Sequence, residues 1–182
     1  MKIAISGAHG VGKTTLAKAL AKELGLPLIE EVARGVAKKC GFKNTEQIRD
    51  ADKTVKMFFQ QNVFVEQQLA EAECFTGFIS DRSIFDPLAY CMYYDIDHEV
   101  FRNNAIEWSE NYDFIVYCPI PDGGISDDGF RLTDEESQWF IGAALRWLLL
   151  SSKCSVLWLG KDRSKWESDV LEYITQRKKK NQ

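Results

Sequence analysis

A glycine-rich loop near the start of the chain constrains the fold more than any other feature. Residues 7–14 read Gly-Ala-His-Gly-Val-Gly-Lys-Thr, that is, Gly, four free positions, Gly, Lys and Thr. This is the pattern of a phosphate-binding P-loop. A short apolar run at residues 2–6 precedes the loop, and apolar residues recur at helical spacing over residues 14–24. Strand, loop and helix in this order predict a site for a nucleoside triphosphate.

Each part of the loop has an expected role. The glycines reach backbone angles that other residues avoid, so successive N–H groups can converge on phosphate oxygens. Lys13 supplies a positive charge for the β- and γ-phosphates, and the hydroxyl of Thr14 can bind Mg²⁺. We therefore expect ATP and Mg²⁺ as cofactors, with a nucleotide site formed by Gly7, His9, Gly10, Val11, Gly12, Lys13, Thr14 and Thr15.

Bulk composition narrows the class of protein. With 182 residues, 45% of them hydrophobic, residues 1–182 are expected to form a single P-loop domain. A formal net charge of −4 gives no overall attraction for nucleic acid, and the basic run at residues 177–180 is interpreted as a solvated helix end. The five cysteines have no CxxC spacing, and no apolar run reaches about 18 residues. We expect a cytoplasmic monomer or homodimer, with nucleic acid a less favoured partner and no membrane contact.

The remaining chain alternates between strand and helix patterns. Short apolar runs bounded by polar, Gly or Pro residues predict four further strands, at 26–30, 77–80, 114–118 and 155–159. Helical patterns cover 45–74, 83–94, 98–111, 134–151 and 163–178, and Asn44 or Thr45 is the expected cap of the longest. The alternation predicts a three-layer α/β/α fold with a five-stranded parallel sheet and ligands at the carboxyl ends of its strands.

Residues 119–133 interrupt this alternation with two prolines, three glycines and several charged residues. The segment follows the fourth strand, so it starts at the ligand edge of the sheet. Loops of this length in compact α/β domains are usually functional, often as lids. Arg131 is the expected lid cation for the transferring phosphoryl group, with Arg146 as its competitor.

Acidic residues end the second and third predicted strands. A carboxylate at this edge can hold Mg²⁺ or accept a proton from an attacking hydroxyl. We expect Glu30 and Asp81 to have such roles, whereas Glu31 is interpreted as a complement to the dipole of the next helix. The chain has no guanine-recognition motif and no transporter-ATPase signature, which argues against a GTPase and a transporter ATPase.

Two segments are similar to motifs of known kinases. Ile-Glu-Glu-Val-Ala-Arg at 29–34 resembles the Glu-Pro-Val-Ala-Arg stretch of deoxyribonucleoside kinases, and Asp-Arg-Ser at 81–83 resembles their Glu-Arg-Ser motif and the Asp-Arg-Tyr of thymidylate kinases. Over nearly the whole chain, the order of features resembles a family of small P-loop kinase-like proteins that includes the nicotinamide ribonucleoside kinase domain of the bacterial NAD regulator. The matching pieces are residues 5–10, 80–83, 86–90, 112–115 and 127–131.

The resemblance implies a role for several residues. Glu30 would orient or deprotonate the acceptor hydroxyl, Asp81 would help to hold Mg²⁺, and Arg82 would contact phosphate. Arg34 would support Glu30 or bind substrate phosphate, and Arg163 would lie by the adenine. Lys13, Glu30, Asp81, Arg82 and Arg131 are thus the expected catalytic set.

Aromatic residues on the predicted helix at 45–74 have two interpretations. Phe58, Phe59 and Phe64 follow the second strand, so they could line a pocket for an acceptor base, with Phe59 as the substrate residue. Packing in the core is the more common fate of such a stripe.

The sequence therefore predicts an ATP- and Mg²⁺-dependent kinase with a nucleoside or nucleotide-like acceptor. A nucleoside acceptor suits Glu30 as a base, whereas a nucleoside monophosphate would need more cations, which Arg34, Arg82 and Arg131 could supply. The alternatives are a nucleotide-dependent switch or regulatory ATPase, and a kinase acting on a modified base or hydroxyl in DNA.

Overall fold

A parallel sheet of five strands forms the centre of the molecule in the computed structural model, which describes residues 1–121 and 135–180. The strand order is β2-β3-β1-β4-β5, and every neighbouring pair is parallel. The expected α/β fold with a five-stranded parallel sheet is confirmed. The strands are β1 (Lys2–Gly7), β2 (Leu28–Ile29), β3 (Phe78–Asp81), β4 (Phe114–Cys118) and β5 (Ser155–Trp158).

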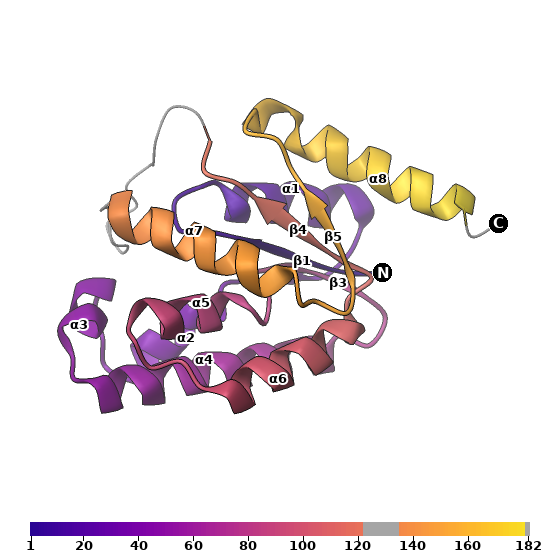
Figure 1. The fold of residues 1–182 in the computed structure, drawn as a ribbon. Helices are drawn as coiled ribbons and strands as arrows, with labels where there is room; N and C mark the ends of the chain where they lie inside the picture. Colours follow the sequence, from indigo (N-terminus) through magenta and orange to yellow (C-terminus); the bar gives the residue numbers. More distant parts are fainter. Residues whose placement is uncertain (122–134, 181–182) are drawn as a thin grey trace.

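Helices cover both faces of the sheet and complete the three layers. Figure 1 shows α1 (Lys13–Leu24) and α8 (Trp166–Lys180) on one face, and the other labelled helices on the opposite face. Short 3₁₀ turns, η1 (Ser109–Asn111) and η2 (Arg163–Lys165), precede β4 and α8. The helices of the second layer are α2 (Val32–Lys39), α3 (Thr45–Asp50), α4 (Lys53–Glu73), α5 (Asp86–Tyr93), α6 (Glu99–Trp108) and α7 (Glu135–Leu149).

Two helices differ from the sequence expectation. The long helix expected over 45–74 is broken into α3 and α4, because Ala51 is extended and the carboxylate of Asp52 caps a new helix by accepting a hydrogen bond from the Val55 N–H at 2.9 Å. Asn44 caps α3, as one of the two expected caps. The second difference is α2: the interpretation of Glu31 implied a helix after it, but no bounds were expected for that helix, whose buried residues Val36 and Ala37 pack in the smaller core cluster.

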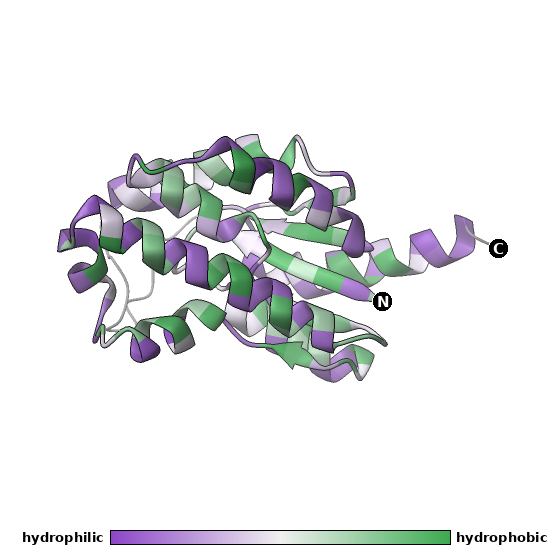
Figure 2. Ribbon diagram, turned by 90° about the horizontal axis from the view of Figure 1, so that it is seen from below, coloured by the Kyte–Doolittle hydropathy of each residue, from purple (hydrophilic) through white to green (hydrophobic). Residues whose placement is uncertain are grey.

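Apolar strands fill the main core, and a second, smaller cluster lies beside it. In Figure 2 the strand at the centre is hydrophobic, whereas the helices around it carry both hydrophobic and hydrophilic residues. The smaller cluster joins α2, α3 and α4 to the end of α5. Its buried members are Val36, Ala37, Ile48, Phe59, Val63 and Tyr94. It forms part of a pocket described below.

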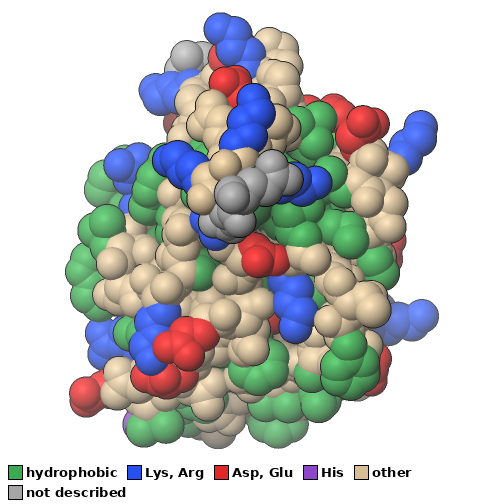
Figure 3. All heavy atoms as spheres, turned by 90° about the vertical axis from the view of Figure 1, so that its right-hand side faces the viewer, with side chains coloured by type: hydrophobic (Ala, Val, Ile, Leu, Met, Phe, Trp, Pro, Cys, Tyr) green, Lys and Arg blue, Asp and Glu red, His purple; other side chains and the backbone are tan. Residues whose placement is uncertain are grey.

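The basic run and the expected lid lie in different parts of the chain. Arg177 and Lys178–Lys180 end α8, and Figure 3 shows Lys and Arg side chains around this end of the helix. This end of α8 lies at the amino ends of the strands, opposite the P-loop (Figure 1).

Most of the expected lid at 119–133, including Arg131, lies outside the described residues. No helix in the described ranges is long and apolar enough to cross a membrane.

Candidate active site

The P-loop connects β1 to α1 and passes close to β4. A Cβ added to Gly7 would lie 2.5 Å from the carbonyl oxygen of Cys118, so a larger residue would push the loop away from the sheet. Gly12 adopts φ 108° at the N-cap of α1, which is a conformation that side chains disfavour. The loop therefore depends on these glycines for both its approach to β4 and its turn into the helix.

Residues from distant elements hold the loop. The amide of Gln138 on α7 donates to the backbone oxygen of His9 at 2.8 Å, and the Arg163 guanidinium donates to the oxygen of Gly10 at 3.3 Å. The ammonium of Lys13 is buried and donates to the oxygen of Ala8 at 2.6 Å. Among the other expected nucleotide residues, Val11 is buried and Thr15 is exposed. Arg163 thus lies at the loop, and its expected position by the adenine stays a prediction.

Thr14 and Asp81 form a pair suited to a hard cation. The Thr14 hydroxyl donates to Asp81 Oδ2 at 2.6 Å, while Oδ1 of the same carboxylate is buried and accepts no hydrogen bond within the described chain. A hydroxyl and an unsatisfied carboxylate oxygen are ligands that fit Mg²⁺, which takes one or two protein oxygens and completes its shell with water and phosphate. The described residues contain no cluster of three or more His, Cys, Asp or Glu that could hold a metal.

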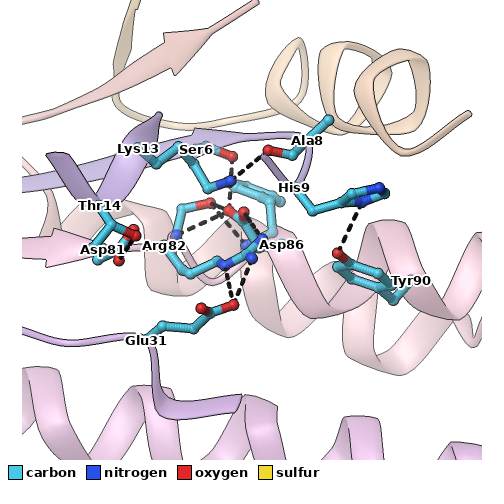
Figure 4. A network of polar contacts seen from close by, with 12 residues as sticks. Ser6, Ala8, His9, Lys13, Thr14, Glu31, Asp81, Arg82, Asp86 and Tyr90 are labelled. Atoms are coloured by element: carbon cyan, nitrogen blue, oxygen red, sulfur yellow. Dashed lines mark hydrogen bonds and ion pairs between the residues drawn. The ribbon is translucent and has the colours of Figure 1, made fainter. Parts of the chain in front are cut away.

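Arg82 lies at the centre of an ionic cluster next to this pair. Its guanidinium donates to Glu31 Oε1 at 2.5 and 3.0 Å and to Asp86 Oδ1 at 3.2 Å (Figure 4). Burial opposes the charge of Arg82, but the carboxylates of Glu31 and Asp86 outweigh it, so the pKa of Arg82 lies well above its ordinary value. The guanidinium therefore stays charged although it is buried.

The backbone of Arg82 is strained. Its φ of 138° lies in a region that residues with side chains rarely occupy. The neighbouring contacts impose this conformation: Asp86 Oδ2 accepts hydrogen bonds from the Ser83 N–H, the Ser83 hydroxyl and the Ser6 hydroxyl at 2.7–2.9 Å. Strained residues concentrate at functional sites, where the surrounding structure holds them in place.

Glu31, rather than Glu30, reaches this cluster. The side chain of Glu31 is 11% exposed and contacts both Arg82 and Arg34, whereas Glu30 is exposed and does not line the adjacent pocket. The expected position of Glu30 in the site is therefore corrected. β2 ends at Ile29 and Glu31 is the N-cap residue of α2; the Glu31 side chain faces Arg82, whereas Glu30 is exposed.

A pocket opens from the Arg82 cluster between α2, α4 and α5. Its walls are mainly apolar and include Val32, Ala33, Ile48, Phe59, Val63, Pro87, Tyr90 and Tyr94. His9 of the P-loop lines its inner end together with Glu31, Arg82 and Asp86. The Tyr90 hydroxyl lies 3.5 Å from Nδ1 of His9 (Figure 4). The P-loop and the pocket thus meet at His9, and Arg82 lines the same pocket.

Of the aromatic residues considered on α4, Phe59 both packs in the smaller core cluster and lines the pocket. Phe64 is buried in the main core and Phe58 is 60% exposed. Gln60 also lines the pocket: its side chain is almost fully buried, and its amide makes no hydrogen bond within the described residues.

Three features of the site were not predicted from the sequence: Asp86, Gln60 and the position of Glu31. Asp86 follows Ser83 by three residues, which is the spacing of a capping box and could have indicated its bond to the Ser83 N–H. The position of Glu31 depends on where β2 ends and α2 begins, which no sequence pattern marks. No sequence pattern indicates that Gln60 is buried, because the residues around it on α4 include both buried and exposed positions.

Comparison with solved structures identifies the fold. Deoxyadenosine kinase from M. mycoides, with products dCMP and dCDP bound, is 19% identical with a TM-score of 0.67, and the match covers 97% of this chain and 100% of that one. Shikimate kinase from Aquifex aeolicus is 16% identical with a TM-score of 0.62, covering 97% and 98%. These similarities confirm the expected P-loop fold of the nucleoside and nucleotide kinase type.

A search of the curated proteins found no significant match. The family described as "AAA domain" matches residues 2–164, which include the P-loop, the Thr14–Asp81 pair and the Arg82 cluster. The chain belongs to this AAA domain family.

Proposed function

We propose that this protein is an ATP- and Mg²⁺-dependent kinase that transfers the γ-phosphoryl group to a hydroxyl of a small molecule of the nucleoside class, which has a flat ring and carries no phosphate. The proposal depends above all on one observation. The P-loop lies next to a separate apolar pocket, and a buried carboxylate–guanidinium pair, Glu31 and Arg82, stands where the two meet. A phosphoryl donor and an acceptor need two adjoining sites of this kind.

The charges at the inner end of the pocket favour an alcohol over a phosphate as acceptor. The acidic and basic lining residues are His9, Glu31, Arg82 and Asp86, and both carboxylates already engage the guanidinium. An acceptor phosphate would approach two carboxylates and a cation that they already neutralise. A neutral hydroxyl can instead donate its hydrogen bond to Glu31. Among the described residues, the nucleoside expectation therefore has more support than the nucleoside monophosphate.

The walls of the pocket favour a flat ring with a polar edge. Phe59, Tyr90 and Tyr94 provide aromatic surface, and the buried amide of Gln60 offers both a donor and an acceptor. A ligand that fills the pocket would cover this amide, and covering it without a partner is costly, so a ligand that bonds to it gains affinity and specificity. A nucleobase or a related heterocyclic amide meets this requirement.

The mechanism then consists mainly of positioning and charge neutralisation. Glu31 would hold the acceptor hydroxyl and take its proton, and Arg82 would keep Glu31 in place. Lys13 would bind the β- and γ-phosphates. Thr14 and Asp81 would hold Mg²⁺, which supplies neutralisation of the phosphate oxygens when bound.

A turnover assay with purified protein tests the proposal against its alternatives. ATP consumption should rise when deoxynucleosides or nicotinamide riboside are added, but not with nucleoside monophosphates or DNA. Turnover that no acceptor stimulates would instead support a switch or regulatory ATPase. Stimulation by DNA alone would support a kinase that acts on nucleic acid.

Two adjacent glutamates provide a matched pair of variants. Glu31→Gln should lower kcat by roughly 10²- to 10³-fold, since general-base catalysis contributes about this much. Glu30→Gln should leave kcat within about twofold, because Glu30 is exposed and outside the pocket. The assignment of Glu31 fails if the two variants are equally active.

A further inference from the structure

A buried carboxylate outside the candidate active site is linked to the segment that carries Arg82. Glu71 lies near the end of α4, and its side chain is buried. Its Oε1 accepts hydrogen bonds from the Gln67 amide at 2.6 Å and from the Tyr112 hydroxyl at 2.8 Å, and its Oε2 accepts one from the Trp108 indole at 2.7 Å. The carboxylate therefore joins α4 to the end of α6 and to the residue pair that precedes β4.

Two of these three donors also contact residues on either side of Arg82. The amide of Gln67 donates to the Ser80 hydroxyl at 2.8 Å, two positions before Arg82. The hydroxyl of Tyr112 accepts from the Ile84 N–H at 3.0 Å, two positions after Arg82. One side chain thus separates the buried carboxylate from each flank of this segment.

The backbone at Arg82 depends on such contacts. Its φ of 138° is strained, and a strained conformation persists only where the surrounding structure fixes it. Asp86 fixes the turn from within the segment that follows, whereas the bonds to Ser80 and Ile84 come from elements outside it. If those bonds were lost, the backbone could relax, and the guanidinium would move relative to Glu31.

We propose that Glu71 is a positioning residue for the kinase reaction, because through Gln67 and Tyr112 it fixes residues 80–84 and so holds Arg82 against Glu31. The inference rests on the proposed function, in which Arg82 keeps Glu31 in place. Glu71 does not line the acceptor pocket. Its effect on turnover therefore passes through the backbone at the end of β3, and displacements of about 1 Å at a reacting group can cost about 100-fold in rate.

The third donor provides a matched control. Trp108 donates to the same carboxylate, but its indole bonds to neither Ser80 nor Ile84. If Glu71 served only to join α4 to α6 and β4, the loss of either the Trp108 bond or the Tyr112 bond would affect turnover alike. If Glu71 positions Arg82, only the loss of the Tyr112 bond should slow the reaction.

Tyr112→Phe and Trp108→Phe separate these two roles. Tyr112→Phe removes one hydroxyl and keeps the ring, which packs edge-on against Phe78. It should lower kcat by roughly 10- to 100-fold and leave the acceptor KM within about twofold. Trp108→Phe should leave both constants within about twofold. Turnover is measured with ATP and each acceptor of the panel above, the deoxynucleosides and nicotinamide riboside, and chemical denaturation measures the stability of both variants.

Two variants of Glu71 itself extend the test. Glu71→Gln keeps an oxygen that can accept from Gln67 and Tyr112, so its kcat should stay within about threefold of the wild type. Burial raises the pKa of Glu71 to about 7, so an uncharged side chain is compatible with this position near neutral pH. Glu71→Leu leaves no acceptor and should lower kcat at least as far as Tyr112→Phe does. Should Glu71→Leu fail to fold, the pair Tyr112→Phe and Trp108→Phe still decides.

The failures of this inference and of the proposed function give different results. Equal kcat values in Tyr112→Phe and Trp108→Phe would overturn the inference, whether both match the wild type or both fall. A higher acceptor KM at unchanged kcat in Tyr112→Phe would also overturn it, since the effect would then lie in the pocket. A wild-type protein that no acceptor stimulates would overturn the proposed function and this inference together.

Discussion

Two buried polar clusters flank β3, and both contain carboxylates and their hydrogen-bond donors, but the clusters have different roles. At the carboxyl end, Arg82 joins Glu31 and Asp86, and Asp81 lies next to them. On the α4 and α6 side of the strand, a single carboxylate, Glu71, accepts hydrogen bonds from Gln67, Trp108 and Tyr112 at 2.6–2.8 Å. We refer to them as the Arg82 cluster and the Glu71 cluster.

The two clusters differ in what they leave unsatisfied. The side-chain oxygens of Glu71 all have donors, and Gln67 also reaches the Ser80 hydroxyl at 2.8 Å. Near Arg82, by contrast, Asp81 Oδ1 has no hydrogen-bond partner in the described chain, and the Arg82 backbone is strained. A cluster whose polar atoms all have hydrogen-bond partners stabilises the packing of its elements. A cluster with an unpaired buried polar atom can bind a ligand there. The following variants test this distinction.

The largest expected effect follows from Asp81→Asn. The isosteric amide keeps an oxygen for the Thr14 hydroxyl but removes the charge proposed to hold Mg²⁺. Turnover should fall by roughly 10³-fold, while the free energy of unfolding changes by less than about 1 kcal/mol. Kinetics with a Mg²⁺ titration and chemical denaturation measure the two effects.

Asp86→Asn serves as the control for this variant, since the Asp86 carboxylate already accepts four hydrogen bonds. Its substitution should lower the free energy of unfolding by about 1–3 kcal/mol. Equal stability losses in Asp81→Asn and Asp86→Asn would contradict the division into ligand-binding and structural oxygens.

The next effect concerns Glu71 and pH. Burial raises the pKa of Glu71 to about 7 from an ordinary value of 4.5, so the folded state favours the protonated form. The stabilisation from this group is full below pH 4.5 and is lost as pH rises to about 7. Relative to Glu71→Gln, which cannot titrate, the wild type should lose about 3 kcal/mol across this window. Denaturation at a series of pH values tests this; parallel curves for the two proteins would contradict it.

The smallest effect compares two glutamines on α4. Gln60→Leu should leave stability unchanged or slightly higher and raise the acceptor KM about tenfold, because only the pocket uses its amide. Gln67 also lines the pocket, but its amide already donates to Glu71 and Ser80, so Gln67→Leu should instead lower the free energy of unfolding by about 1–3 kcal/mol. A KM change in Gln67→Leu alone would reverse the roles assigned to the two residues.

The sequence predicted the parts of the site that local patterns encode. The P-loop, the position of Asp81 at the end of β3 and the parallel sheet follow from spacing and periodicity within short windows. The pairing of Glu31 with Arg82 joins residues 51 positions apart, and the choice between Glu30 and Glu31 depends on where β2 ends. The break between α3 and α4 was not predicted, because its one local sign is a single polar residue, the cap Asp52, within an apolar pattern that otherwise continues.

The Glu71 cluster was not foreseen either. Its residues are a Gln and a Glu on α4, a Trp at the end of α6 and a Tyr before β4, each unremarkable in its own segment. Only the tertiary packing brings their polar ends together and buries them.

The strained backbone of Arg82 has a consequence for how this position would change under selection. Arg82→Gly and Arg82→Ala lose the same guanidinium, but glycine accepts φ 138° without strain, so Arg82→Gly should be the more stable of the two by about 1 kcal/mol. Among variants at this position, a library screened only for thermal resistance should therefore enrich Arg82→Gly. A library screened for turnover should retain arginine. Arginine should also outlast both variants under heat, because without its guanidinium Glu31 and Asp86 remain as buried carboxylates with no neutralising partner.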